Sequence, residues 1–196
     1  MKNPVLIVLL VIAAVLLFVG CGQYNTFVDL DEEVDTAWSK VESAYQSRAD
    51  LVPNLVNTVK GSADFERGTL EAVTQARANA TSIKFDADDL TPENLARYQE
   101  AQSQLSGSLS RLLVAVERYP ELRTTAQFQE LQAQLEGIEN RIRVERNRFN
   151  DSVEPYNKRI RRFPGTFFAT VFGFDERARF EADAGAERAP TVDFSN

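Results

Sequence analysis

Apolar residues recur at steps of three and four along the second half of this chain. The longest such series contains Phe128, Leu131, Leu135, Ile138, Ile142, Phe149, Val153, Tyr156, Ile160 and Phe163. Residues at this spacing lie on one face of an α-helix, because a helix makes a turn in about 3.6 residues. The series therefore predicts one long amphipathic helix with a narrow buried seam, and it excludes a β-sheet over this part of the chain.

Other helices are predicted from similar spacing and from their end signals. A second apolar series runs from Phe27 to Val59, and Lys60-Gly61-Ser62 follows it, where glycine is typical of a helix C-cap. A shorter helix is predicted over residues 65–83. Thr91-Pro92 is typical of a helix start, since threonine caps the first turn and proline fits its first position. The helix that begins there is expected to stop at Tyr119-Pro120.

Short connections between the four predicted helices favour antiparallel neighbours. We therefore predict an all-α fold, an antiparallel up-and-down four-helix bundle of long helices behind an N-terminal membrane segment. The bundle is expected to comprise residues 24–163.

The first 23 residues are predicted to anchor the chain to a membrane. The 15 residues from Val5 to Val19 are all apolar. A spanning helix needs about 20 such residues, whereas the sequence that ends at Cys21 resembles a bacterial lipobox, so lipidation of Cys21 remains an alternative. Only Lys2 precedes the run and acidic residues follow it from Asp29. This charge difference places the C-terminal domain outside the cytoplasm.

Composition excludes several classes of function. The sequence has no histidine and one cysteine, which rules out histidine-based catalysis, the usual zinc and di-iron sites, and an intrachain disulfide. Its formal net charge of -7 argues against nucleic-acid binding, which needs a basic surface. We predict a protein that is not an enzyme, with no catalytic residue, no cofactor and no bound metal.

Charged residues interrupt both long apolar series, Arg48 in the first and Glu145 in the second. If the two helices are antiparallel with Leu30 level with Ile160, Arg48 lies within one turn of both Glu139 and Glu145. We predict an ion pair or hydrogen-bonded cluster of Arg48 with one or both acids. The alternative is that helix rotation carries each charge to the rim of the bundle.

The same register places Pro53 opposite Gly137. The absent side chain of the glycine would let the kinked backbone approach. Substitution of Gly137 by leucine is then expected to destabilise the domain through overpacking.

Residues 164–180 form an aromatic segment that the predicted topology brings back to the membrane end. It is expected either to cap the open end of the core or to insert into the bilayer interface, with preceding basic residues on anionic head groups. The candidate membrane contacts are Lys158, Arg159, Arg161, Arg162, Phe167, Phe168 and Phe172. Residues 181–196 are small and polar, so this tail is expected to be disordered.

Several short motifs follow one another along the chain. They include Tyr24-Asn25-Thr26-Phe27, Ala37-Trp38, Val52-Pro53-Asn54-Leu55, Tyr119-Pro120-Glu121-Leu122, Glu136-Gly137-Ile138-Glu139-Asn140-Arg141, Phe149-Asn150, Tyr156-Asn157 and Phe172-Gly173-Phe174. Together and in this order, they resemble the LemA family over residues 24–180. The resemblance implies a bacterial envelope protein with one N-terminal membrane segment and a helical bundle, in a family whose biochemical role is not established.

These observations favour a scaffold or adaptor for other envelope proteins, because an anchored bundle with long charged faces offers docking surfaces and no catalytic chemistry. The alternative is a ligand-sensing bundle that binds a small molecule in its core. The expected partners are the membrane and envelope proteins, and nucleic acid is not among them. The expected location is the bacterial cell membrane, with the C-terminal domain outside the cytoplasm.

Overall fold

The computed structural model describes residues 4–61, 66–85 and 89–181, and the regular secondary structure among these residues is helical, with no strand. The helices are α1 (Pro4–Lys60), α2 (Arg67–Ser82), α3 (Pro92–Val116), α4 (Pro120–Arg123), α5 (Ala126–Arg161) and α6 (Gly165–Phe172). The predicted all-α class is confirmed. The disorder expected for the C-terminal tail lies outside the described residues, apart from Glu181.

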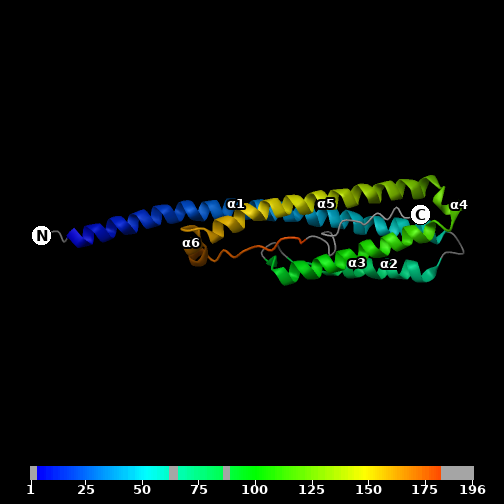
Figure 1. Ribbon diagram of the computed structural model, residues 1–196, viewed down its shortest axis with the longest axis horizontal. Helices are drawn as coiled ribbons and strands as arrows, with labels where there is room; N and C mark the ends of the chain where they lie inside the picture. Colours follow the sequence, from blue (N-terminus) through cyan, green and yellow to red (C-terminus); the bar gives the residue numbers. More distant parts are fainter. Residues whose placement is uncertain (1–3, 62–65, 86–88, 182–196) are drawn as a thin grey trace, which may run out of the picture.

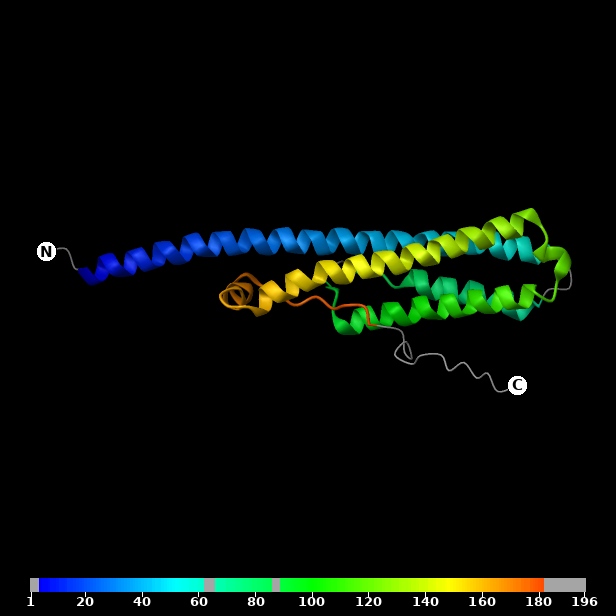
Figure 2. The ribbon, with the colours of Figure 1, turned by 45° about the horizontal axis from the view of Figure 1, so that its top comes forward.

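The long helices are arranged as two side-by-side pairs. α1 lies along α5, and α2 lies along α3 beside them (Figure 1, Figure 2). The chain reverses direction from α1 to α2, from α2 to α3, and again from α3 to α5. The N-terminal part of α1 extends beyond the rest of the described chain (Figure 2).

Several helix ends follow the local sequence signals. α1 ends at Lys60, directly before Gly61, as expected. α3 begins at Pro92, and the Thr91 hydroxyl accepts a hydrogen bond from the Asn94 backbone N at 3.2 Å. α3 ends at Val116, three residues before the expected stop at Tyr119-Pro120, and Pro120 then opens the short helix α4, which was not predicted from the sequence.

Pro53 lies inside α1 without ending the helix. Proline has no N–H, so the carbonyl oxygen of Ala49, four residues earlier, loses its helical partner. Arg77 Nε of α2 donates a hydrogen bond to that oxygen at 2.6 Å. The oxygen freed by the proline therefore becomes an attachment point for α2.

Buried side chains form two clusters along the long axis. The aromatic core lies nearer the N-terminal part of α1 and includes Phe27, Trp38, Tyr45, Tyr98, Phe149, Tyr156, Phe168 and Phe180. The aliphatic core lies at the far end and includes Leu51, Val52, Leu55, Val59, Val73, Leu105, Leu109, Leu112, Leu131 and Leu135. Arg48 lies on α1 between the two cores.

The register of α1 and α5 differs from the one expected from the sequence. Trp38 packs against Phe149 with ring centroids 5.6 Å apart, and Arg48 Nη1 lies 2.8 Å from Glu139 Oε1. These pairs are offset by about one helical turn from the expected register. The apolar series fixed which faces meet but not how far one helix slides along the other.

Gly137 does not face Pro53 in this register. It is exposed on α5, and a Cβ atom added there would meet no described atom within 4 Å. The expected overpacking at position 137 is therefore wrong.

Candidate functional site

The N-terminal part of α1 carries a long run of exposed apolar side chains. Leu17 is 71% exposed and Phe18 is 84% exposed. Among the described residues, one helix, α1, is long and apolar enough to cross a membrane. A signal sequence meets the same criteria, so the helix alone does not distinguish a spanning anchor from a lipoprotein signal. Cys21 is exposed, and α1 continues through it without a break.

α6 packs against α1 just beyond that apolar run. The ring of Phe168 lies 3.2 Å from the position that a Cβ atom on Gly20 would take, and Phe168 is only 7% exposed. Gly165 lies against the carbonyl oxygen of Arg159 so closely that no side chain would fit there. The prediction that Phe168 contacts the membrane is therefore wrong, because its ring is buried in the space that Gly20 leaves open.

The opposite face of α6 is exposed. On α6, Phe167 is 58% exposed, Val171 60% and Phe172 39%, and Phe163, in the turn before α6, is 88% exposed. α6 thus covers the end of the aromatic core with one face and presents apolar side chains to the outside with the other. Capping of the core and insertion into the bilayer interface are therefore compatible interpretations of this segment.

The basic residues expected at the membrane end occupy the last turn of α5 and the residue after it. Lys158, Arg161 and Arg162 are exposed, and Arg159 is half-buried. Arg161 Nε lies 3.9 Å from Glu176 Oε1, and both side chains are more than half exposed. Such an exposed pair contributes little to stability.

Residues 173–181, here called the C-terminal strap, run back from α6 toward the start of α3 (Figure 1). Asn157 Nδ2 donates to the Arg177 carbonyl at 2.8 Å, and Asn157 Oδ1 accepts from the Arg177 backbone N at 2.9 Å. Asn150 makes the same two bonds with Phe180, at 3.0 and 2.9 Å. The two asparagines of α5 therefore hold the strap backbone as a neighbouring β-strand would.

Side chains of the strap complete the aromatic core. Phe180 is 6% exposed, and its ring centroid lies 6.2 Å from that of Trp38 and 5.5 Å from that of Phe149. Arg177 Nη2 lies 2.9 Å from Asp31 Oδ1, with both side chains largely buried. The strap is thus fixed by rings, amides and an ion pair together.

Sequence analysis did not identify Asn150 and Asn157 as functional residues. A signal was present, because each asparagine directly follows an aromatic residue of the buried seam, Phe149 or Tyr156. The spacing of seven residues places both amides on one side of the helix, next to the core. A polar amide at such a position requires a hydrogen-bond partner.

Arg48 joins three helices at the junction of the two cores. It is 2% exposed. Its Nη1 pairs with Glu139 of α5 at 2.8 Å and donates to the Ser106 hydroxyl of α3. Its Nη2 donates to the carbonyl oxygen of Gln102 at 3.0 Å and to Gln102 Oε1 at 2.8 Å. Gln102 Nε2 in turn donates to the Ala80 carbonyl of α2 at 3.3 Å. We call Arg48, Gln102, Ser106 and Glu139 the polar cluster.

Glu145 does not belong to this cluster. Its Oε1 lies 3.0 Å from Arg148 Nη1 on the same helix, although the residue is only 7% exposed. The offset of about one turn between α1 and α5 brings Glu139 level with Arg48 and leaves Glu145 farther along. Of the two acids considered from the sequence, the structure brings one to Arg48.

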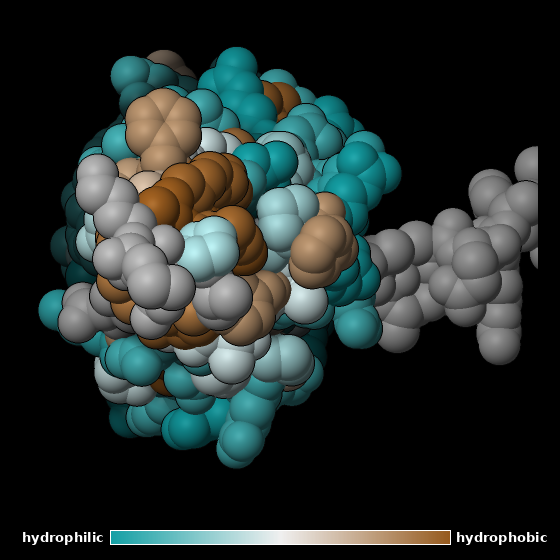
Figure 3. Space-filling view, turned by 90° about the vertical axis from the view of Figure 1, so that its left-hand side faces the viewer, coloured by the Kyte–Doolittle hydropathy of each residue, from teal (hydrophilic) through white to brown (hydrophobic). Residues whose placement is uncertain are grey.

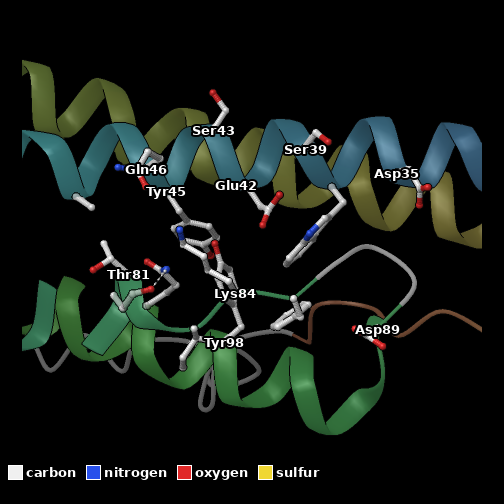
Figure 4. A pocket seen from close by; sticks show the side chains of 16 residues that line it. Asp35, Ser39, Glu42, Ser43, Tyr45, Gln46, Thr81, Lys84, Asp89 and Tyr98 are labelled. Carbon is white, nitrogen blue, oxygen red and sulfur yellow. Dashed lines mark hydrogen bonds between the residues drawn. The ribbon is translucent and has the colours of Figure 1, made fainter. Parts of the chain in front are cut away.

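A cavity of 810 Å³ opens between α1, the end of α2 and the start of α3 (Figure 4). Figure 4 shows the side chain of Glu42 pointing from α1 toward the segment that carries Tyr98. The lining is mainly aromatic and polar and includes Asp35, Trp38, Glu42, Tyr45, Lys84, Phe85, Asp89 and Tyr98. Over the described ranges, no three His, Cys, Asp or Glu side chains are placed to hold a metal ion.

Two buried tyrosines are held in their neutral form. Burial raises the pKa of Tyr98 well above its ordinary value, and the neighbouring Tyr45 and Glu42 raise it further. Burial also raises the pKa of Tyr156, whose hydroxyl donates to the Asp175 carbonyl at 3.0 Å, and Asp31 adds to this effect. Both groups therefore act as neutral hydrogen-bonding and packing groups near pH 7.

Comparison with known proteins places these features in a family context. A family model described as the LemA family matches residues 37–194. The chain is also similar to protein LemA of Metamycoplasma hominis, at 27% identity over 108 residues, which is 55% of this chain. That alignment covers 46% of the relative, so the chain spans about half the length of the relative it matches. The family match includes the aliphatic core, the polar cluster, the strap and the part of the aromatic core that follows residue 36.

Proposed function

The chain belongs to the LemA family, and from that premise we propose that it is a membrane-anchored, non-enzymatic scaffold or adaptor for other proteins of the bacterial envelope. In this proposal α1, α2, α3 and α5 form an antiparallel up-and-down four-helix bundle. Residues 1–23 hold the bundle at the cell membrane, and the C-terminal domain lies outside the cytoplasm.

The observation that carries this proposal is the continuity of α1. One helix exposes apolar side chains as far as Val19 and then supplies core residues from Phe27 to Val59. A partner bound to the side of the domain would therefore be held by the same rigid element that enters the membrane. Presentation of a partner at a defined place is what a scaffold requires.

The exposed sides of α3 and α5 support reversible binding. They carry many charged and amide side chains, such as Glu100, Gln104, Arg111, Glu136 and Arg143. Non-obligate protein interfaces are about as polar as the rest of a protein surface. These sides suit partners that associate and separate.

Crosslinking in intact membranes tests the adaptor role. A photoreactive residue is placed at Arg143 on α5 or at Arg111 on α3, and crosslinked products are identified by mass spectrometry. We expect the same envelope protein to be recovered in repeated experiments. A control probe at buried Leu105 should give no such product, and the absence of any reproducible partner at exposed sites would contradict the proposal.

Two measurements test the anchor. Protease added to spheroplasts should digest the domain without lysis, since the domain is proposed to lie outside the cytoplasm. The substitution Cys21→Ser leaves a spanning helix unaffected, whereas a lipoprotein would accumulate unprocessed and lose labelling by a fatty-acid probe.

The cavity beside Trp38 favours a second candidate function, small-molecule sensing. Trp38 is the single tryptophan of the sequence and lines that cavity. Its fluorescence should therefore change when a ligand binds. A small molecule that co-purifies with the protein and alters this emission would favour sensing over the adaptor role.

A further inference from the structure

We propose that the exposed face of α6 lies in the interfacial layer of the bilayer, so that the domain rests on the membrane at a second point besides α1. The partner is a lipid surface, and the contact residues are Phe163, Phe167, Val171 and Phe172. This inference rests on the proposed function, in which α1 anchors the chain.

The chemistry of α6 fits an interfacial segment. The helix from Gly165 to Phe172 contains no charged residue. Phe167 and Val171 lie four residues apart on α6, which places them on one stripe, and Phe163 lies in the turn before the helix; each of the three is more than half exposed. Apolar side chains gain free energy when they leave water, and phenylalanine is typical of helices that lie in the headgroup region.

The position of α6 matches the level at which a spanning α1 would leave the bilayer. The apolar run of α1 ends at Val19, and Phe168 of α6 packs on Gly20, the next residue. Tyr24, whose ring lies 5.2 Å from that of Phe172, follows one turn later, where aromatic residues are enriched at membrane boundaries. Figure 3 views the molecule from the end at which α1 projects, and it shows apolar surface at this end within a hydrophilic rim.

The protein fixes the orientation of this face. α6 ends at Gly173, whose φ of 79° lies in the left-handed region that favours glycine. The chain then turns back, and Phe174 packs against Tyr24 and Phe27 with ring centroids 5.9 and 5.1 Å apart. Contacts with α1, α5 and the strap therefore hold the exposed stripe of α6 in a fixed orientation.

Basic residues precede α6 in the chain, and the exposed acids Asp175 and Glu176 follow it in the strap. Lys158 and Arg162 are exposed directly before α6, and basic residues near a membrane are attracted to anionic head groups. The exposed acids of α1 begin at Asp29, about 14 Å along the helix from Gly20 at ~1.5 Å per residue. They lie beyond the depth that an interfacial helix occupies.

Quenching by brominated lipid tests the proposal with the full chain. The protein is reconstituted in vesicles of phosphatidylcholine and phosphatidylglycerol that carry bromine near the top of the acyl chains. Phe167→Trp should lose about half of its added emission, because an interfacial helix lies roughly 5–10 Å into the headgroup and acyl boundary. Trp38 is retained, since its buried ring contributes a constant emission. This background is measured on the unsubstituted protein and subtracted.

Two matched variants separate the possible outcomes. Val114→Trp replaces a residue that is 71% exposed on α3, far from α6, and it should not be quenched. Phe18→Trp reports on the anchor itself and should be quenched. If position 18 is quenched and position 167 is not, the inference about α6 is overturned and the anchor stands. If neither position is quenched, both the membrane anchor and the inference about α6 are contradicted.

A protein covering the α6 face would give a different result. The emission of Phe167→Trp would then shift to shorter wavelength without quenching by lipid, and this would also overturn the proposal. Circular dichroism melting of each variant shows whether it is folded. Phe167→Tyr, which keeps an aromatic ring, should melt at the temperature of the unsubstituted protein.

Discussion

The aromatic core and the aliphatic core lie in the same interior but are built from different kinds of side chain. Around the aliphatic core, α1, α2, α3 and α5 run together, and leucine and valine side chains occupy the space between them. Around the aromatic core α2 has ended and α3 is only beginning, so fewer helices enclose the space. Large rings and the C-terminal strap take the place of the missing helix there. A segment without regular secondary structure can thus complete a helical core, provided that polar side chains satisfy its backbone.

The largest expected effect concerns the ring that closes the aromatic core. Phe180→Ala should lower the free energy of unfolding by about 3–5 kcal/mol, because a buried ring is removed and a cavity remains. Urea denaturation measures the loss. Phe163→Ala is the matched control, since Phe163 is 88% exposed and its removal should change the stability of detergent-solubilised protein little. Equal effects at both positions would mean that the strap is not part of the core.

The junction between the cores should respond strongly to loss of Arg48. Arg48→Met removes the partner of Glu139 and should cost about 2–3 kcal/mol, below the range for fully buried pairs because the Glu139 side chain is 40% exposed. The double variant with Glu139→Leu should recover much of the loss. Glu145→Leu in the same background should instead be additive, and coupling to Glu145 would contradict the observed register.

The strap should also depend on its asparagine clamps. Asn157→Ala removes both hydrogen bonds to the backbone of Arg177 and should cost about 1–2 kcal/mol. In this variant, hydrogen exchange at residues 175–180 should be faster than in the unsubstituted protein, whereas exchange in α3 should be unchanged. Asn140→Ala removes an exposed amide that bonds only Arg143 among the described side chains, and it should leave both stability and strap exchange unchanged.

The hydrogen bond from Arg77 of α2 to the Ala49 carbonyl of α1 should contribute less to stability, and its contribution should depend on Pro53. Arg77→Met leaves the Ala49 carbonyl without its donor and should cost about 1 kcal/mol. In a Pro53→Ala background the restored N–H can bond that carbonyl, so the same substitution should cost less. An undiminished loss in that background would show that Arg77 acts through other contacts.

The smallest expected effect lies outside both cores and has the opposite sign. Gly137→Ala should raise the free energy of unfolding by about 0.5–1 kcal/mol, because alanine restricts the unfolded chain and the site is open. Thermal melting measures it. Destabilisation would mean that position 137 is covered in the assembled protein.

Features set by neighbouring residues were predictable from the sequence. The end of α1 before Gly61 and the start of α3 at Thr91-Pro92 follow from capping chemistry, which depends on adjacent residues alone. The place of Arg48 in an apolar series left a buried cluster and a rim position as alternatives, and the structure shows the buried one.

Features set by distant residues were less predictable. A seam that repeats every three or four residues fits equally well after a slide of one turn, so it did not distinguish Glu139 from Glu145 as the partner of Arg48. The strap lacks any repeat, and its path depends on Asn150 and Asn157, far earlier in the chain. The spacing of seven residues between the two asparagines is visible in the sequence, but the strap has no matching repeat that would identify it as their partner.

The unbroken α1 also acts as a lever. From Tyr24 to Lys60 the helix rises about 55 Å at ~1.5 Å per residue, so the tip that carries α4 stands far above the level of α6. A tilt of about 20°, common for membrane helices, would move that tip sideways by roughly 19 Å. In the proposed anchored state, the range over which the tip meets another molecule would be set by the angle of α1 at its base, where α6 contacts it.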